Sequence, residues 1–205
     1  MRLRPSLFVL LLLTMLSSGC TATRLTDVWR DTSYNSGTLK NVLVIAIKKD
    51  QTRRRVWEEA FVAALSKEGV TATASYKLFP NAMPDTNEVR ATVRQNGYDG
   101  VVVTNRLSQE IRQTYVPSSV QVVPVVRYSW FYNTYYTANR YVETPGYTEN
   151  EKIVRYETHV WEAKEDGRLI WSAVSETPDP SSAQAFSTDL TAAIVPELVK
   201  VGILP

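Results

Sequence analysis

The sequence predicts one α/β domain in which a mixed sheet packs against helices. Two continuous apolar runs have the character of strands buried on both faces, and stretches of helical periodicity separate them. A turn signal and a long helical pattern follow in the second half. The expected fold is a single-domain sandwich: a βαβαβ unit on residues 41–105, then a β-hairpin and a C-terminal helix.

The first buried strand is NVLVIAI, residues 41–47, where most side chains are β-branched. Trp57, Phe61, Ala64 and Leu65 then recur at helical spacing, and Gly69 is placed to end that helix. This predicts a strand followed by an amphipathic helix with one buried face.

The same order repeats in the next segment. VTATASY, residues 70–76, is strand-like, and Asp85 with Glu88 three positions later is a capping-box arrangement that opens a second helix. Gly97 closes that helix, and GVVVTN, residues 100–105, is the third strand. Strands separated by helices at such short intervals are typical of parallel crossover units.

The second half predicts a hairpin and a covering helix. Asp166-Gly167 lies between two strand-like runs, which is a strong hairpin signal. Alternation in the first arm divides its side chains between a core face (Val154, Tyr156, Thr158, Val160) and a face toward water or a partner (Arg155, Glu157, His159). The C-terminal helix begins with the cap-like residues Ser181 and Ser182 and is expected to bend or restart at Pro196.

The N-terminus has the order of an export signal. Arg2 and Arg4 precede an apolar run from Leu7 to Leu16, which is shorter than the roughly 20 residues that span a bilayer, and small residues follow. The alternative is a short buried helix. We interpret 1–19 as a signal peptide, 20–40 as the N-terminus and tether, and 41–205 as the domain.

The tether contains one apolar patch. Leu25, Val28 and Trp29 are expected to dock on the domain, although Trp29 could also rest at a lipid interface.

Charge and cysteine content exclude several classes. The two surplus positive charges of the chain are Arg2 and Arg4, so the chain after residue 19 is formally neutral and has no basic excess for nucleic acid. Cys20 is the single cysteine, so no disulfide can form within the chain. Core packing alone is expected to hold the fold.

The motifs of catalysis are missing. His159 is the single histidine, and the sequence contains no G-x-S-x-G, no Walker loop and no zinc spacing. Arg54 and Glu58 are four residues apart and are expected to pair weakly on an exposed helix face. We predict no catalytic residue, metal or cofactor. The alternative is a cell-wall or glycan-processing enzyme that uses paired carboxylates.

Residues 114–150 are unusually aromatic. They hold seven of the 11 tyrosines, and the high strand preference together with three prolines favours an edge strand or a hairpin arm. One interpretation is a partner-binding surface, because Tyr and Trp are enriched at interfaces; the other is that the rings pack along the sheet. The candidate surface comprises Tyr128, Trp130, Tyr132, Tyr135, Tyr136 and Tyr141.

The stretch LSSGC, residues 16–20, resembles the lipobox of bacterial lipoproteins. The resemblance implies a lipidated N-terminal Cys20, and Thr21, where Asp would mark inner-membrane retention, favours a periplasm-facing outer-membrane location. The strand–helix rhythm from Asn41 to Asn105 is similar to the amino-terminal domain of TolB and to envelope-assembly lipoproteins. The resemblance implies a membrane-anchored binding or scaffolding module whose partner is an envelope protein, with the oligomeric state left open.

Overall fold

The computed structural model describes residues 23–164 and 167–205. It divides into two compact units, which are described separately: the first comprises Met1–Ser108 and Val154–Pro205, and the second comprises Gln109–Ile153. The predicted signal peptide, Cys20 and Asp166 of the predicted turn lie outside the described residues. No helix among the described residues is long and apolar enough to cross a membrane.

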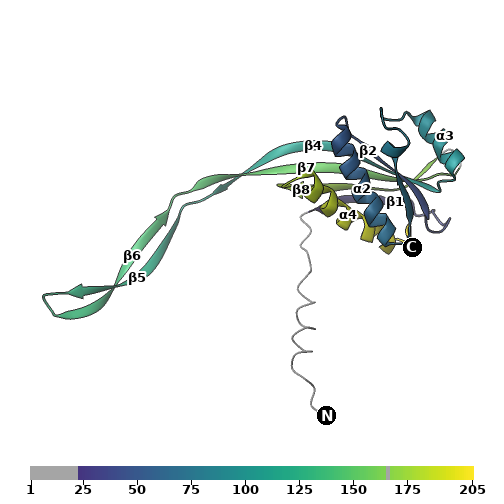
Figure 1. Ribbon diagram of the computed structural model, residues 1–205. Coiled ribbons are helices and arrows are strands. Elements are labelled where there is room, and N and C mark those ends of the chain that lie inside the picture. Colours follow the sequence, from purple (N-terminus) through teal and green to yellow (C-terminus); the bar gives the residue numbers. More distant parts are fainter. Residues whose placement is uncertain (1–22, 165–166) are drawn as a thin grey trace, which may run out of the picture. The chain divides into compact units, whose positions relative to one another are not determined.

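The elements confirm an α/β protein with a mixed sheet, with more strand than expected (Figure 1). In chain order they are β1 (Arg24–Arg30), β2 (Asn41–Ile47), α2 (Gln51–Lys67), β3 (Thr71–Ala74), the 3₁₀ turn η2 (Ser75–Lys77), α3 (Thr86–Asn96), β4 (Gly100–Val116), β5 (Ser119–Ser129), β6 (Thr134–Thr144), β7 (Tyr147–Glu162), β8 (Arg168–Pro178) and α4 (Ala183–Lys200).

The strands form a six-stranded sheet of order β1-β8-β7-β4-β2-β3 and a separate two-stranded sheet of β5 and β6. As predicted, β2 is parallel to both β3 and β4. The edge strand β1 pairs antiparallel with β8. The predicted βαβαβ unit is therefore present as β2-α2-β3-α3-β4. Beside it, β7 lies next to β4, and β8 and the edge strand β1 follow.

The larger core lies between the sheet and the helices α2 and α4. Trp57, Phe61 and Leu65 of α2 are all buried, as their spacing predicts. They pack in one cluster with sheet residues and with residues of α4 such as Leu190 and Ile194. On the hairpin arm in β7, Val154, Tyr156, Thr158 and Val160 are buried as predicted.

The opposite face of the sheet is covered by α3, and the cover is thinner. The capping box is formed, since the Asp85 carboxylate accepts from the backbone of Glu88 and the Glu88 side chain accepts from the backbone of Asp85. Gly97 ends the helix in the left-handed region, at φ 66°. Only Val93 of α3 is buried, against Leu43 and Ile45 of β2.

The prediction that Arg54 and Glu58 pair weakly on an exposed face is wrong. Both side chains are fully buried, and Nε of Arg54 lies 3.0 Å from Oε1 of Glu58. The reason is that η2 and the loop after it cover the start of α2, where Ser75 donates to Glu58 and the carbonyl of Phe79 accepts from Arg54. Helical spacing locates the pair on one face but carries no information about which later segment covers that face.

Three further features of the structure add to the expectations from the sequence. Residues 24–30, placed in the tether, form β1, because strand β8 offers a free edge there and Leu25 packs on the core. The segment Gln109–Ile153 forms a compact unit separate from the rest of the chain. The helix α4 does not restart at Pro196, because Ala183–Lys200 is one element that contains this proline; of the two predicted cap residues, Ser182 is the one that caps it.

Candidate binding surfaces: an aromatic hairpin and a groove beside α3

The second unit contains a regular antiparallel hairpin. Strands β5 and β6 pair over their whole length, from Ser119 opposite Thr144 to Ser129 opposite Thr134. The β-branched run VQVVPVV favours this extended conformation. Pro124 is tolerated because the hairpin has only two strands, so a residue that lacks an N–H can face an open edge.

The turn of the hairpin spans residues 130–133. Asn133 takes a positive φ of 47°, which Asn accepts more readily than other non-glycine residues. Its side-chain oxygen accepts a hydrogen bond from the Tyr128 hydroxyl. The ring of Phe131 lies 5.0 Å from that of Tyr132, edge to face. The turn is thus locally ordered by contacts within the hairpin.

All six residues of the candidate surface lie on this hairpin, and all are exposed. Trp130 and Tyr132 lie in the turn and are 83% and 75% exposed. The remaining four lie on the strands, with 49 to 72% of each side chain exposed: Tyr128, Tyr135, Tyr136 and Tyr141. Within the second unit these rings do not pack into a core, which leaves them accessible to a partner.

Register and alternation divide the strand rings between the two faces of the hairpin. Tyr128 lies opposite Tyr135 in the register, and their ring centroids are 5.0 Å apart. Tyr136 pairs with Arg127 on the other face. The face that carries Tyr128 is the more apolar of the two, and its exposed members are Val120, Val122, Val126, Tyr128, Tyr135 and Tyr141.

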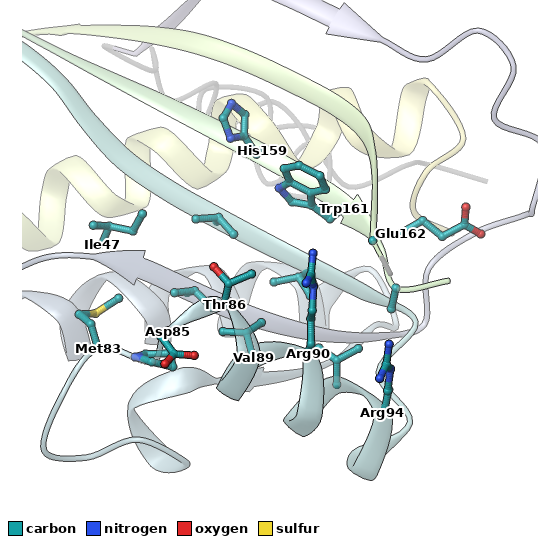
Figure 2. A pocket seen from close by; sticks show the side chains of 17 residues that line it. Ile47, Met83, Asp85, Thr86, Val89, Arg90, Arg94, His159, Trp161 and Glu162 are labelled. Atoms are coloured by element: carbon teal, nitrogen blue, oxygen red, sulfur yellow. The ribbon is translucent and has the colours of Figure 1, made fainter. Parts of the chain in front are cut away.

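The first unit contains a groove of about 420 Å³ between α3 and the sheet (Figure 2). Its floor is apolar, formed by residues such as Ile45, Val101 and Val103, and Trp161 of β7 lies along one side. In Figure 2, Arg90 extends from α3 toward Trp161, and Arg94 lies further along the same helix. The volume is within the range of small-molecule sites, and the lining suits an apolar group.

The groove holds no assembled catalytic pair. Its two carboxylates, Asp85 and Glu162, lie toward opposite ends in Figure 2. Asp85 is engaged as the cap of α3, and Glu162 lies 3.4 Å from the Lys164 amine. His159, on the partly exposed face of β7 as predicted, pairs with Glu157 at 3.0 Å. Among the described residues no cluster of three or more His, Cys, Asp or Glu could hold a metal ion.

On the α2 side of the sheet, Lys48 lies among aromatic rings at the end of β2. Its amine donates to the Tyr156 hydroxyl at 2.7 Å and sits 3.7 Å from the centroid of the Trp57 ring. Burial, together with the positive charges of Arg106 and Arg53, lowers the pKa of Lys48 to about 8. Burial also raises the pKa of Tyr156. The arrangement fixes the Lys48 side chain on the core.

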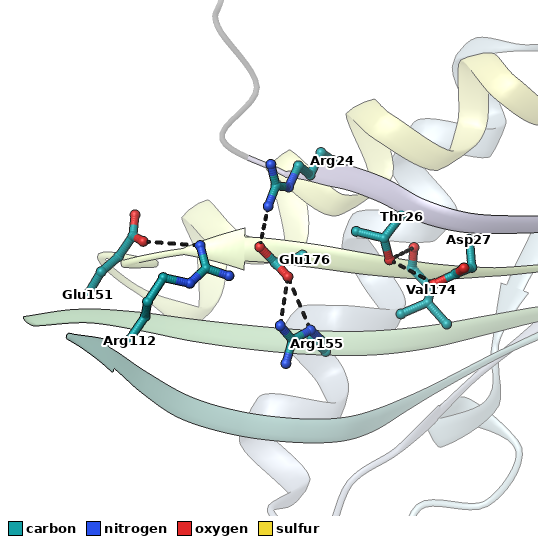
Figure 3. Close-up of polar contacts among 8 residues, drawn as sticks. All are labelled: Arg24, Thr26, Asp27, Arg112, Glu151, Arg155, Val174 and Glu176. Atoms are coloured by element: carbon teal, nitrogen blue, oxygen red, sulfur yellow. Dashed lines mark hydrogen bonds and ion pairs between the residues drawn. The ribbon is translucent and has the colours of Figure 1, made fainter. Parts of the chain in front are cut away.

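A buried carboxylate fastens β1 to the sheet (Figure 3). Glu176 of β8 accepts from Arg24 of β1 at 2.6 Å and from Arg155 of β7 at 2.9 Å, and its side chain is only 6% exposed. Arg24 lies four positions after Cys20 in the sequence. Any group attached at Cys20 is therefore separated by very few residues from β1, which the Arg24–Glu176 ion pair ties to β8.

The groove is the surface that sequence reasoning missed. Alternation along β7 places His159 and Trp161 on the same face, and this signal was available in the sequence. What the sequence does not reveal is how far α3 covers that face, and hence that Val103 and Trp161 are left only partly buried.

No known protein-family profile matches the chain, and no curated protein matches it. Among solved structures, a PelC dodecamer from Paraburkholderia phytofirmans is 11% identical, with 84% of this chain and 94% of that chain covered and a TM-score of 0.44. A PDZ domain protein from Parabacteroides distasonis is 13% identical with a TM-score of 0.39, and the alignment covers 89% of this chain and 38% of that one.

Proposed function

We propose that this chain is a lipid-anchored lipoprotein of the bacterial outer membrane that faces the periplasm and serves as a binding or scaffolding module without enzymatic activity. Cys20 carries the lipid. The aromatic surface of the β5–β6 hairpin holds an envelope protein. The observation that carries the proposal is the exposure of Tyr128, Trp130, Tyr132 and Tyr135, each more than half exposed on a regular, hydrogen-bonded hairpin.

The physical reason is that exposed aromatic rings on a regular, hydrogen-bonded backbone are suited to recognition. Tyr and Trp present a large contact area with few rotatable bonds, so a partner orders them at little cost in entropy. A ring such as Tyr135, 72% exposed, contributes little to folding, because most of its surface stays in water. Such rings gain free energy when a partner covers them.

The test replaces three rings, Tyr132, Tyr135 and Tyr136, with Ala. We expect the melting temperature to fall by no more than about 4 °C, which corresponds to roughly 1 kcal/mol at this chain length, and cross-linking to the partner protein in cells to be lost. Tyr115→Ala with Tyr147→Ala is the matched control, because it removes exposed rings of the same unit outside the surface. Retained cross-linking in the triple variant, or loss in the control alone, contradicts the proposal.

A further inference from the structure

The hairpin has two open edges, and this is unusual for so long a pair of strands. Strands β5 and β6 form a two-stranded sheet of their own, so each has a row of backbone groups with no neighbouring strand in the described structure. Two-stranded hairpins are only marginally stable in water, and three or more strands with an apolar face are normally needed. Open edges of this kind are templates for pairing with another chain.

The two edges differ in how well they are protected. β5 contains Pro124 near its middle, and proline on an edge strand blocks the addition of a further strand. β6, with the sequence TYYTANRYVET, has no Pro, Gly or Lys to interrupt or repel a neighbour. The edge open to pairing is therefore that of β6.

The position of Pro124 also shows which backbone N–H and C=O groups of β6 face its open edge. In an antiparallel pair of strands, two opposite residues either exchange both backbone hydrogen bonds or point their N–H and C=O groups away from each other. Pro124 lies opposite Asn139, and because proline has no N–H to exchange, this pair is of the second kind. The N–H and C=O of Asn139 consequently face the open edge, as do those of Thr137 and Tyr141 by alternation.

We propose that the β6 strands of two copies of this chain pair antiparallel across a two-fold axis at Asn139, which joins the two hairpins into a four-stranded sheet. This register pairs every residue of Thr134–Thr144. It places Arg140 opposite Ala138 and Glu143 opposite Tyr135, so no like charges face each other. A two-fold axis perpendicular to the sheet keeps the apolar faces of both hairpins on the same side.

The inference goes beyond the proposed function, because it concerns the edge of β6 and a second copy of this chain rather than the rings and an envelope protein. A four-stranded sheet with a continuous apolar face supplies the strands that a lone hairpin lacks. Exposed valines such as Val122 and Val126 would then lie on one broad surface shared by both copies.

The test measures the oligomeric state of the full-length protein, purified from membranes in detergent, by analytical ultracentrifugation. Asn139→Pro removes the outward N–H on the axis and should weaken dimerisation roughly tenfold or more, because both copies lose a hydrogen bond. Val122→Pro is the matched control, since alternation from Pro124 places its N–H on the open edge of β5. It should leave the dimer intact. A monomeric parent protein, or equal weakening by both prolines, overturns the inference.

A cysteine scan along β6 tests the register independently. A residue on the two-fold axis lies opposite itself at about 4.5 to 5.5 Å between Cα atoms, which a disulfide can bridge. Oxidative cross-linking should peak at Asn139→Cys and fall on both sides, with the parent chain and its single Cys20 as the background. A peak away from Asn139, no cross-linked dimer at any position of β6, or a protein that stays monomeric yet binds vesicles of phosphatidylethanolamine and phosphatidylglycerol through the hairpin, contradicts pairing with a second copy at this register.

Discussion

Replacement of Arg54 by Met should strongly destabilise the first unit. The guanidinium bonds the Glu58 carboxylate and the Ser75 hydroxyl, and it also donates to the carbonyls of Phe79 and Ala82 at 3.0 Å each. It thereby ties α2 to η2 and to the loop that leads into α3. Methionine has a similar length but can make none of these hydrogen bonds.

The magnitude follows from what the substitution leaves behind. Glu58 is fully buried, and without Arg54 its charge has no cation in contact. Removal of one partner of a buried ion pair costs about 3 to 5 kcal/mol. At about 2 to 4 °C for each kcal/mol in a chain of this size, the melting temperature should fall by about 10 °C. Circular dichroism of the purified protein during heating measures this change.

Two companion variants make the experiment decisive. Arg53→Met removes an exposed neighbour that lies 3.9 Å from Asp50, and it should change the melting temperature by less than about 2 °C. Combining Arg54→Met with Glu58→Met should not restore stability. The backbone N–H groups of Ala46 and Tyr76 donate to the Glu58 carboxylate, and without it they would stay unpaired at a cost of about 1 to 3 kcal/mol each. A single Arg54→Met variant that melts within about 3 °C of the parent refutes the reasoning.

Three further outcomes are expected. The pKa of Lys48 falls from 10.5 to about 8 on folding, so between these values the unfolded chain binds more protons than the folded protein. The free energy of unfolding should therefore rise from about pH 8 to 10. Urea titrations should show this rise for the parent protein and not for Lys48→Met. Glu176→Gln removes the charge that holds β1 and Arg155, and should cost about 1.5 to 3 kcal/mol in the same assay; an unchanged midpoint would show that the ion pairs contribute nothing. Cys20→Ala should eliminate palmitate labelling in cells, and retained label would refute lipidation at that residue.

Local patterns in the sequence were sufficient to predict the elements that are specified by residues close together in the chain. The capping residues Asp85 and Glu88, the buried stripe of α2 and the continuous strand β2 are each specified within a few residues of chain, and each formed as predicted. The aromatic segment was likewise predicted to form strands or a hairpin arm, because β-branched and aromatic residues favour extended backbone wherever they occur.

Contacts between segments far apart in the sequence decided the rest. Arg54 and Glu58 are buried because a loop some 20 residues further along folds over them, and the spacing of residues within α2 carries no information about that loop. The groove exists because α3 covers only part of a sheet face, and β1 belongs to the sheet because β8, almost 150 residues later, offers it an edge. Burial is a property of the assembled layers, so the sequence determined which faces are apolar, and only the tertiary structure determined which of those faces are covered.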